Sequence, residues 1–204
     1  MSSLDTFLLD HEDAPSKREI LRCALLLFVR DGLCETSIRE IGKAAGYTNP
    51  ALYKFFPSKE ALALHLFERC YAHVFAAIER SQAQNQPLKG RVAALVRAFT
   101  SLVDDSLDAV LYVDENLRTL WPRLPRAARR HSVLQVLGGL VEAGRREATI
   151  SPACDTNLAV AMLIGTMSQI ARMAYFDEVA RPLSSHRVHL QTLFLNALKG
   201  RGTR

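Results

Sequence analysis

Residues 36–56 read TSIREIGKAAGYTNPALYKFF, and this stretch decides the fold. Its pattern predicts a helix of about two turns, a tight glycine turn and a second short helix, which is the helix-turn-helix arrangement. Gly46 supplies the residue that tolerates a positive φ angle in the turn. Small or branched apolar residues on the inner faces allow the two helices to cross closely, and these are Ile38, Ile41, Ala45 and Leu52.

The outer face of the second predicted helix carries short polar and basic groups. Groups of this kind suit the edges of bases in a DNA major groove, and here they are Thr48, Asn49, Lys54 and the hydroxyl of Tyr53. Short helix pairs joined by a glycine turn also occur in unrelated folds. The pattern alone therefore leaves a purely structural pair open.

Helices are predicted on both sides of this pair, so the fold class is all-α with about nine helices. Ser16–Glu19 and Ser37–Glu40 each have the spacing of a capping box, which places one helix start at Ser16 and the next at Thr36 or Ser37. Asp31-Gly32 ends the first helix, and a long helix is expected over residues 59–83. Prolines and paired aspartates separate the later helices, which are expected near residues 88–104, 107–120, 124–147, 155–179 and 184–199.

The composition is that of a globular protein: 49% of the 204 residues are hydrophobic, 23% are charged, and the formal net charge is +5. No apolar run approaches the ~18 residues that a membrane span needs, so no membrane partner is expected. Residues 1–13 hold four acidic side chains and neither Lys nor Arg, unlike a signal peptide, which predicts a flexible acidic tail on a cytoplasmic protein. The basic surplus is weak evidence for nucleic acid, because most of it lies beyond residue 70.

Residues 14–65 resemble the DNA-binding domain of TetR-family transcriptional regulators. The resemblance implies a helix-turn-helix domain over these residues, with its motif at 37–56, followed by a helical ligand-binding and dimerisation domain over residues 66–204. The matching positions are Ile20, Ala24, Phe28 and Gly32, then Thr36-Ser37-Ile38 and Ile41, and most specifically Ala45-Gly46-Tyr47-Thr48, Leu52-Tyr53, Phe56, Lys59-Glu60 and Leu62.

The resemblance assigns DNA contacts to ten residues, namely Thr36, Ser37, Arg39, Tyr47, Thr48, Asn49, Pro50, Tyr53, Lys54 and Lys59. Thr36 and Ser37 would begin a helix whose free N–H groups bind a phosphate, and Arg39 would contact guanine through two hydrogen bonds. Thr48 would reach base edges or phosphate. Two alternatives stay open, because Arg39 could instead pair with a neighbouring glutamate and Tyr47 could lie in the core.

The remaining contacts are implied for the second short helix and the start of the next one. Asn49 would reach base edges or phosphate, and Pro50 would pack against a thymine methyl group. Lys54 would contact a base or a phosphate, whereas Tyr53 and Lys59 would bind phosphates. The structural alternatives are a capping role for Asn49, a core position for Tyr53 and an ordinary surface charge for Lys59.

A dimer is implied as well, since two-fold dimers read two half-sites of an inverted repeat in double-stranded DNA. The interface would lie on small or apolar faces of the last two helices, formed by Leu158, Ala161, Met162, Gly165, Ser168, Gln169, Leu190, Leu193, Phe194 and Ala197. Alternatively, both faces pack within one monomer.

An effector pocket is implied among the middle helices. The candidate lining residues are Phe99, Val103, Tyr112, Asn116, Leu120, Trp121, His131, Met167, Met173 and Phe176. Their mostly apolar character favours an apolar or aromatic effector. A basic stripe of Arg123, Arg126, Arg129 and Arg130 is either a solvated helix face or a surface for an anionic ligand or a partner.

Neither an enzyme nor a cofactor is predicted, because the sequence contains no GxSxG, GxGxxG, P-loop or HExxH motif. The pairs Cys70–His73 and His186–His189 lack further ligands at suitable spacing, so no metal site is expected. The hypothesis is a dimeric repressor that a small molecule releases from a palindromic operator. The alternatives are an activator, a regulator controlled by a protein partner, and a helical enzyme or binding module with a coincidental motif.

Overall fold

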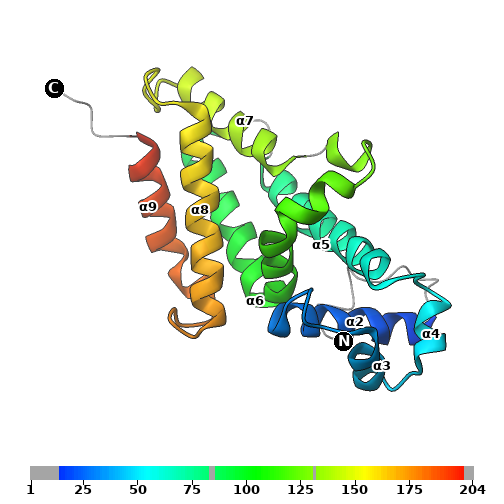
Figure 1. The fold of residues 1–204 in the computed structure, drawn as a ribbon. Helices are drawn as coiled ribbons and strands as arrows, with labels where there is room; N and C mark the ends of the chain where they lie inside the picture. Colours follow the sequence, from blue (N-terminus) through cyan, green and yellow to red (C-terminus); the bar gives the residue numbers. More distant parts are fainter. Residues whose placement is uncertain (1–13, 83–85, 131, 200–204) are drawn as a thin grey trace. The chain divides into compact units, whose positions relative to one another are not determined.

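The computed structural model describes residues 14–82, 86–130 and 132–199, and the only regular structure in these ranges is helical (Figure 1). The all-α prediction is confirmed, with eight α-helices among the described residues where about nine were expected for the chain. The predicted acidic tail, residues 1–13, lies outside the described residues. The helices are α2 (Pro15–Asp31), α3 (Ile38–Ala45), α4 (Asn49–Tyr53), α5 (Lys59–Ser81), α6 (Leu88–Leu120), α7 (Val133–Arg146), α8 (Thr156–Tyr175) and α9 (Arg187–Lys199), with 3₁₀ turns η1 (Trp121–Arg123), η2 (Ala128–Arg130) and η3 (Leu183–His186).

The chain forms two compact units that do not follow one another in sequence. Unit 1 consists of the residues up to His73 together with Asp108–Arg129, and unit 2 consists of Val74–Leu107 together with the residues from Arg130 onward. The long helices α5 and α6 therefore each contribute to both units. The functional division expected after residue 65 stays a prediction, and the compact unit that holds the helix-turn-helix is larger than that segment.

The core of unit 1 joins α2, α5 and the C-terminal half of α6. Tyr112 of α6 is fully buried, and its hydroxyl donates a hydrogen bond to the Ala63 carbonyl of α5 at 3.0 Å. Its ring stacks on Phe28 of α2 at a centroid distance of 5.8 Å. Trp121 packs against Tyr71 at 4.5 Å, which places η1 on α5. These contacts make residues 108–129 part of the support for α2 and α5.

Helix α2 begins differently from the prediction. Ala14 is its N-cap and makes no side-chain capping bond, while Pro15 occupies the first turn. The capping box expected at Ser16 is therefore wrong. Proline at the first helical position needs no N–H partner and already has a helical φ angle, so the helix starts before the serine. Glu19 instead accepts a hydrogen bond from Arg22 Nε at 3.1 Å, and this contact lowers the pKa of Glu19.

Two other predicted boundaries also differ. Residues 88–104 and 107–120 form one helical run that is interrupted by non-helical backbone at Ser106 (φ −148°, ψ 39°). The helix expected over residues 124–147 does not form as one element. Pro122 and Pro125 accompany two short 3₁₀ turns, and α7 starts only where Ser132 caps it by accepting the Leu134 N–H at 3.2 Å.

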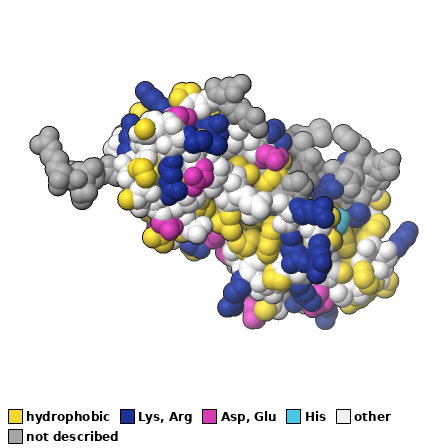
Figure 2. All heavy atoms as spheres, turned by 90° about the horizontal axis from the view of Figure 1, so that it is seen from above, with side chains coloured by type: hydrophobic (Ala, Val, Ile, Leu, Met, Phe, Trp, Pro, Cys, Tyr) yellow, Lys and Arg dark blue, Asp and Glu magenta, His cyan; other side chains and the backbone are white. Residues whose placement is uncertain are grey.

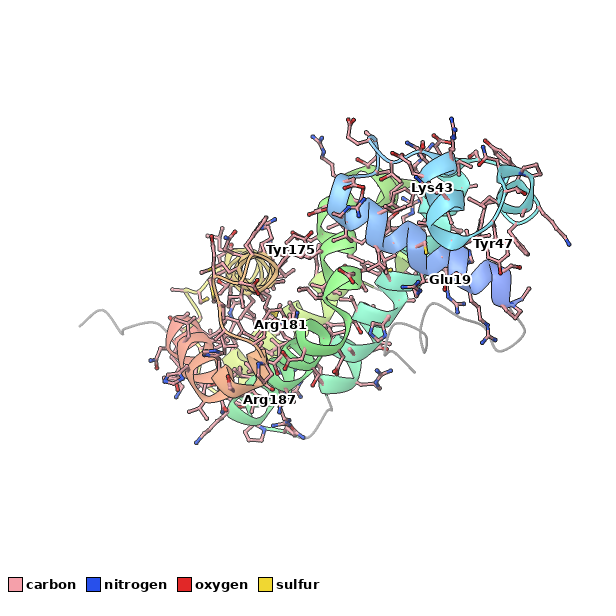
Figure 3. All side chains as sticks on the ribbon, turned by 90° about the horizontal axis from the view of Figure 1, so that it is seen from below. Glu19, Lys43, Tyr47, Tyr175, Arg181 and Arg187 are labelled. Carbon is pink, nitrogen blue, oxygen red and sulfur yellow. The ribbon has the colours of Figure 1, made fainter. Side chains whose placement is uncertain are left out.

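In unit 2, polar contacts attach the start of α9 to the N-terminal half of α6. The Asp104 carboxylate accepts the N–H groups of Leu183 at 2.6 Å and Ser184 at 2.9 Å. Arg187 donates to the Thr100 hydroxyl at 2.8 Å, and Arg181 donates to the Asp104 carbonyl at 3.1 Å. Both arginines are labelled in Figure 3. Asp104 therefore serves as a cap for η3 as well as a link between two helices.

Helix α8 is long and apolar enough to cross a membrane by length and composition, with a mean hydropathy of 1.2 over its apolar window, and no other helix in the described ranges is. Only 33% of that window is buried within the chain. A single helix of this kind is weak evidence for a membrane, because helices that pack against another protein surface have the same composition.

Candidate nucleic-acid interface

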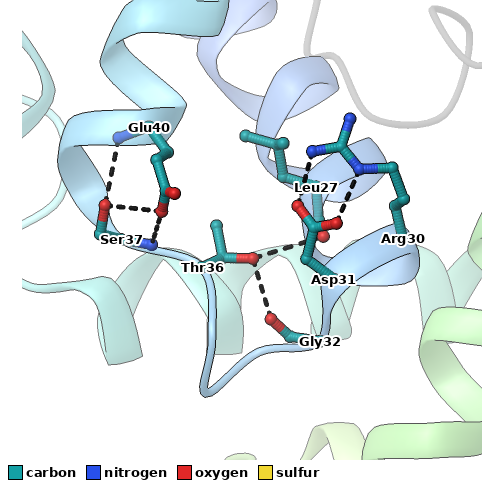
Figure 4. Close-up of polar contacts among 7 residues, drawn as sticks. All are labelled: Leu27, Arg30, Asp31, Gly32, Thr36, Ser37 and Glu40. Carbon is teal, nitrogen blue, oxygen red and sulfur yellow. Dashed lines mark hydrogen bonds and ion pairs between the residues drawn. The ribbon is translucent and has the colours of Figure 1, made fainter.

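The first part of the candidate interface is α3, whose N-terminus is built by Ser37 and Glu40. Ser37 is the N-cap, and its Oγ accepts the N–H of Glu40 at 3.2 Å. The Glu40 carboxylate in turn accepts the backbone N–H of Ser37 at 2.8 Å (Figure 4). The N–H and then the hydroxyl of Ser37 stabilise the charged carboxylate, so the pKa of Glu40 is lowered. The capping box predicted here is confirmed.

The turn between α3 and α4 depends on two glycines. Gly46 has φ 74° and ψ 25°, the left-handed conformation that the sequence predicted. The N–H of Tyr47 donates to the Gly42 carbonyl at 2.9 Å, which closes the turn on α3. A Cβ atom at Gly42 would lie only 2.8 Å from the Tyr47 carbonyl oxygen, so the close approach of α3 to the turn requires glycine.

The second part of the interface is α4, which has one buried and one exposed side. Leu52 is 1% exposed, so it packs α4 against the rest of unit 1. Pro50 lies in the first turn, as expected, and Thr48 occupies the N-cap position without a side-chain capping bond. The residues that face outward are Thr48, Asn49, Pro50, Tyr53 and Lys54. Tyr53 is 51% exposed, so the structure does not give it the core position that was its alternative.

Basic and aromatic side chains extend this exposed surface onto α3 and the turn. Arg39 is exposed on α3, and Tyr47 is 37% exposed in the turn. Lys43, which is not among the predicted DNA contacts, is also exposed and lies one helical turn after Arg39 (Figure 3). The four-residue spacing between Arg39 and Lys43 was the signal that would have found it, because residues i and i+4 share a helix face.

The N–H groups of Thr36 and Ser37 themselves have partners within the chain. Thr36 is 2% exposed, its N–H donates to the Gly32 carbonyl at 3.2 Å, and its hydroxyl donates to the same carbonyl at 2.8 Å (Figure 4). Ser37 donates its N–H to Glu40. The phosphate contact expected from the free N–H groups of the helix that these residues begin stays a prediction. The next N–H groups, on Ile38 and Arg39, begin the helix and lack intrahelical partners by geometry.

Lys59 is placed at the first turn of α5, next to this segment. Its ammonium group donates to the carbonyl oxygens of Leu33 at 2.9 Å, Cys34 at 3.1 Å and Thr36 at 2.9 Å. Phe56, just before α5, is 6% exposed and contacts the ring of His65 at 5.3 Å. Phe56 is thus a core residue, and Lys59 has three partners within the chain.

Comparison with known proteins identifies this arrangement. Residues 20–66 match the family model described as bacterial regulatory proteins of the tetR family. This segment of the chain belongs to the tetR family. The matched segment runs from within α2 to within α5, so it contains both helices of the helix-turn-helix and the glycine turn. The protein is a DNA-binding transcriptional regulator.

The sequence similarity between this regulator and its relatives extends over both units. It is 27% identical over 158 residues to the HTH-type transcriptional repressor KstR2 of Rhodococcus jostii, covering 74% of this chain and 75% of that one. It is 22% identical over 157 residues to the fatty acid metabolism regulator protein of Bacillus subtilis, covering 76% and 81%. The fold resembles the crystal structure of FadR from Bacillus subtilis in complex with stearoyl-CoA, with a TM-score of 0.67 at 17% identity, covering 88% and 98%.

The residues selected for an effector pocket are divided between the two units of the regulator. Phe99, Val103, Met167, Met173 and Phe176 belong to unit 2, Tyr112, Asn116, Leu120 and Trp121 belong to unit 1, and His131 lies outside the described residues. Tyr112 is a core residue with a satisfied hydroxyl, and Phe176 is 67% exposed at the end of α8. Their common role in one pocket stays a prediction.

Unit 2 does contain a hollow, of about 940 Å³, but none of these residues lines it. Its walls come from the end of α5, the start of α6 and one side of α7, and most of its side chains are polar. The lining residues are Glu79, Gln82, Gln86, Pro87, Arg91, Gln135, Val136, Gly139, Ala143, Arg146 and Glu147.

The residues selected for the dimer interface separate into two groups. Leu190 and Phe194 are 8% and 0% exposed, so they form the core beneath α9 and their placement on an outer face is corrected. Leu158, Ala161, Gly165 and Gln169 on α8 are exposed, as are Leu193 and Ala197 on α9, while Met162 and Ser168 are half-buried. The exposed group follows one face of each helix, because its members are separated by three or four residues.

The arginines Arg123, Arg126 and Arg130 are exposed and Arg129 is half-buried, on 3₁₀ turns and the segment between them instead of on one long helix. Figure 2 shows that Lys and Arg side chains occur in separate groups among hydrophobic and acidic ones on the face seen from above. On this face the positive charge is therefore divided among several groups, and it does not by itself mark the DNA-reading side.

Proposed function

We propose that this regulator is a cytoplasmic, homodimeric repressor that reads an inverted-repeat operator through α3 and α4 and leaves it when a small molecule binds. The observation that carries the proposal is the two-sided construction of the α3–α4 pair. Its inner side is closed by Gly42 and Leu52, while its outer side presents polar, basic and aromatic groups. A dimer supplies a second copy of this surface, which gives the two half-sites required for strong specificity.

The DNA contacts proposed for the outer side fall into two kinds. Arg39 and Asn49 would read base edges, so replacing either with alanine should relax the preference at particular base pairs, at a cost of about 1–3 kcal/mol per position. Tyr53 and Lys54 would contact phosphates, so Tyr53→Phe and Lys54→Met should weaken binding to all sequences about equally. Fluorescence anisotropy with duplexes selected on the purified protein measures both effects. Equal loss on all sequences from both kinds of variant would contradict the assignment.

The proposed dimer surface is a stripe on α8 that runs from Leu158 to Phe176. Leu158 is 72% exposed and Phe176 is 67% exposed, and Ala161, Gly165 and Gln169 lie between them on the same face. At 1.5 Å per residue the stripe is about 27 Å long. Small residues in its centre let a second helix approach closely, and exposed apolar residues at its ends need cover from water.

Sedimentation analysis tests this surface with a matched pair of exposed leucines. Leu158→Glu should convert the dimer into a monomer, because it places a charge in an apolar contact. Leu134→Glu on α7, where the leucine is 60% exposed but lies outside the stripe, should leave the dimer intact. A monomeric wild-type protein, or a Leu158→Glu variant that stays dimeric, would contradict the proposed interface.

The proposed effector is a long-chain acyl thioester or another molecule with an extended apolar part. The support comes from the Bacillus subtilis relatives, one named for fatty acid metabolism and one solved in complex with stearoyl-CoA, together with the apolar residues selected for the pocket. Stearoyl-CoA should raise the melting temperature and release labelled DNA, whereas coenzyme A without the acyl chain should do neither. DNA release by neither compound would exclude this effector class and leave the DNA-binding proposal in place.

A further inference from the structure

The ammonium group of Lys59 is fully used inside the chain. It donates to three carbonyl oxygens at 2.9, 3.1 and 2.9 Å, those of Leu33, Cys34 and Thr36. An ammonium group has three N–H donors, so each donor has one partner and no donor remains. The three acceptors are backbone atoms of the short segment 33–36, which lies 23 to 26 residues before Lys59 in sequence.

The segment 33–36 leads directly into α3. Thr36 holds its other side, since its hydroxyl donates to the carbonyls of Gly32 at 2.8 Å and Leu27 at 3.3 Å at the end of α2. Ser37, the next residue, is the N-cap of α3. The entry to α3 is thus attached to α2 through Thr36 and to α5 through Lys59. A change at either attachment moves the start of the helix that precedes the recognition helix.

A phosphate contact would require Lys59 to give up these partners. The ammonium would then leave up to three carbonyl oxygens without their donor. Two of them, those of Leu33 and Thr36, lie in partly buried contacts, where an unpaired carbonyl is unfavourable. Lys54 on the exposed surface has no such competing role, because its side chain faces outward at the end of α4. The two lysines therefore differ in what their charges contact.

We propose that Lys59 is a positioning residue for DNA recognition: it fixes the 33–36 segment to the start of α5 and so sets the place of α3, without contacting a phosphate itself. This inference rests on the proposed function, because it concerns the same DNA-reading surface. It departs from the phosphate contact that the family resemblance implies for Lys59.

The first experiment uses the free protein and needs no DNA. Amide hydrogen exchange is compared in wild type, Lys59→Met and Lys59→Arg. Lys59→Met removes the three donors, and Lys59→Arg keeps the positive charge but presents a flat fork of N–H groups that cannot donate three hydrogen bonds from a single nitrogen to these three carbonyls. Both variants should accelerate exchange at Thr36 and Ile41, whose N–H groups donate within the entry to α3. Wild-type exchange in both variants would overturn the proposal.

The second experiment measures the salt dependence of binding to duplex DNA. Loss of one phosphate contact lowers the slope of log K against log salt by about 0.9, whereas loss of a positioning contact leaves the slope unchanged. We expect Lys59→Met to lose the preference for selected over random duplexes, so that its affinities for the two are nearly equal. The slope of log K against log salt should stay that of wild type. A slope reduced by about 0.9 in Lys59→Met and restored in Lys59→Arg would overturn the proposal. If wild type binds no DNA, the proposed function fails, while the exchange measurement still decides whether Lys59 holds the segment.

Discussion

Replacing Gly42 with alanine tests the closest approach in the helix-turn-helix. The added Cβ would lie 2.8 Å from the Tyr47 carbonyl oxygen, 3.4 Å from Asn49 Oδ1 and 3.6 Å from Leu52 Cδ1. The nearest of these atoms belongs to the backbone. The turn cannot withdraw freely, because the Tyr47 N–H donates to the Gly42 carbonyl at 2.9 Å. Alanine at this position must therefore move α3 away from the turn.

The free energy of unfolding should fall in this variant. A helix gains about 1 kcal/mol when an interior glycine becomes alanine, and forcing a methyl group into a packed site costs typically about 1–3 kcal/mol. Because the obstacle is a backbone atom, we expect a cost near the upper end of that range, about 3 kcal/mol. Subtracting the helix gain leaves a net loss of about 2 kcal/mol in the free energy of unfolding. For a chain of this size about 1 kcal/mol corresponds to a change of about 2–4 °C, so the melting temperature should fall by about 4–8 °C.

Gly139→Ala is the matched control, because Gly139 lies within α7 and its Cβ would meet nothing within 4 Å. That variant should gain about 1 kcal/mol and melt about 2–4 °C higher. Thermal unfolding followed by circular dichroism compares the two variants, and anisotropy measures operator binding, which only Gly42→Ala should weaken. A Gly42→Ala protein that melts at or above the wild-type temperature and binds the operator normally would refute the reasoning.

Three other substitutions test contacts described above. Glu40 has a pKa below the ordinary value of 4.5, so its charged form stabilises the folded state above that pH, and this contribution is lost as the pH falls through the lowered pKa. The difference in melting temperature between wild type and Glu40→Gln should therefore shrink from pH 7 to pH 3. A constant difference would contradict the role of the charge. Tyr112→Phe removes the bond to the Ala63 carbonyl and should cost about 1 kcal/mol in urea unfolding, whereas an unchanged midpoint would show that the bond contributes nothing. Asp104→Ala removes the acceptor for two N–H groups at η3 and should cost about 1 kcal/mol; hydrogen exchange at Leu183 and Ser184 should rise with it, and protection equal to wild type would contradict the cap.

The DNA-reading segment was predictable where its signals are local. The Ser37 cap, the Gly46 turn, Pro50 in the first turn of α4 and the burial of Leu52 all follow from residues within a few positions of each other. Local signals also failed where two of them competed. At the start of α2, Pro15 decided the helix boundary over the capping pattern at Ser16.

Contacts between distant residues were not predictable from patterns of this kind. Lys59 meets carbonyls that lie up to 26 residues earlier, and Tyr112 reaches the Ala63 carbonyl across 49 residues. A sequence pattern is a pattern of side-chain types. The acceptor in these contacts is a backbone carbonyl, which every residue has, so no pattern marks it. The periodicity of α9 did not indicate that Leu190 and Phe194 face inward, because both sides of that helix carry leucine.

The order in which the chain is synthesised affects how unit 1 is completed, because that unit contains residues from two separate segments. At about 5–20 residues per second, the segment from Asp108 emerges roughly 2–7 s after His73. Until then Phe28 lacks the ring of Tyr112 and Tyr71 lacks Trp121. A nascent chain therefore cannot finish its DNA-reading unit before much of α6 exists, and an isolated fragment that ends at residue 65 should be less stable than the same residues in the full chain.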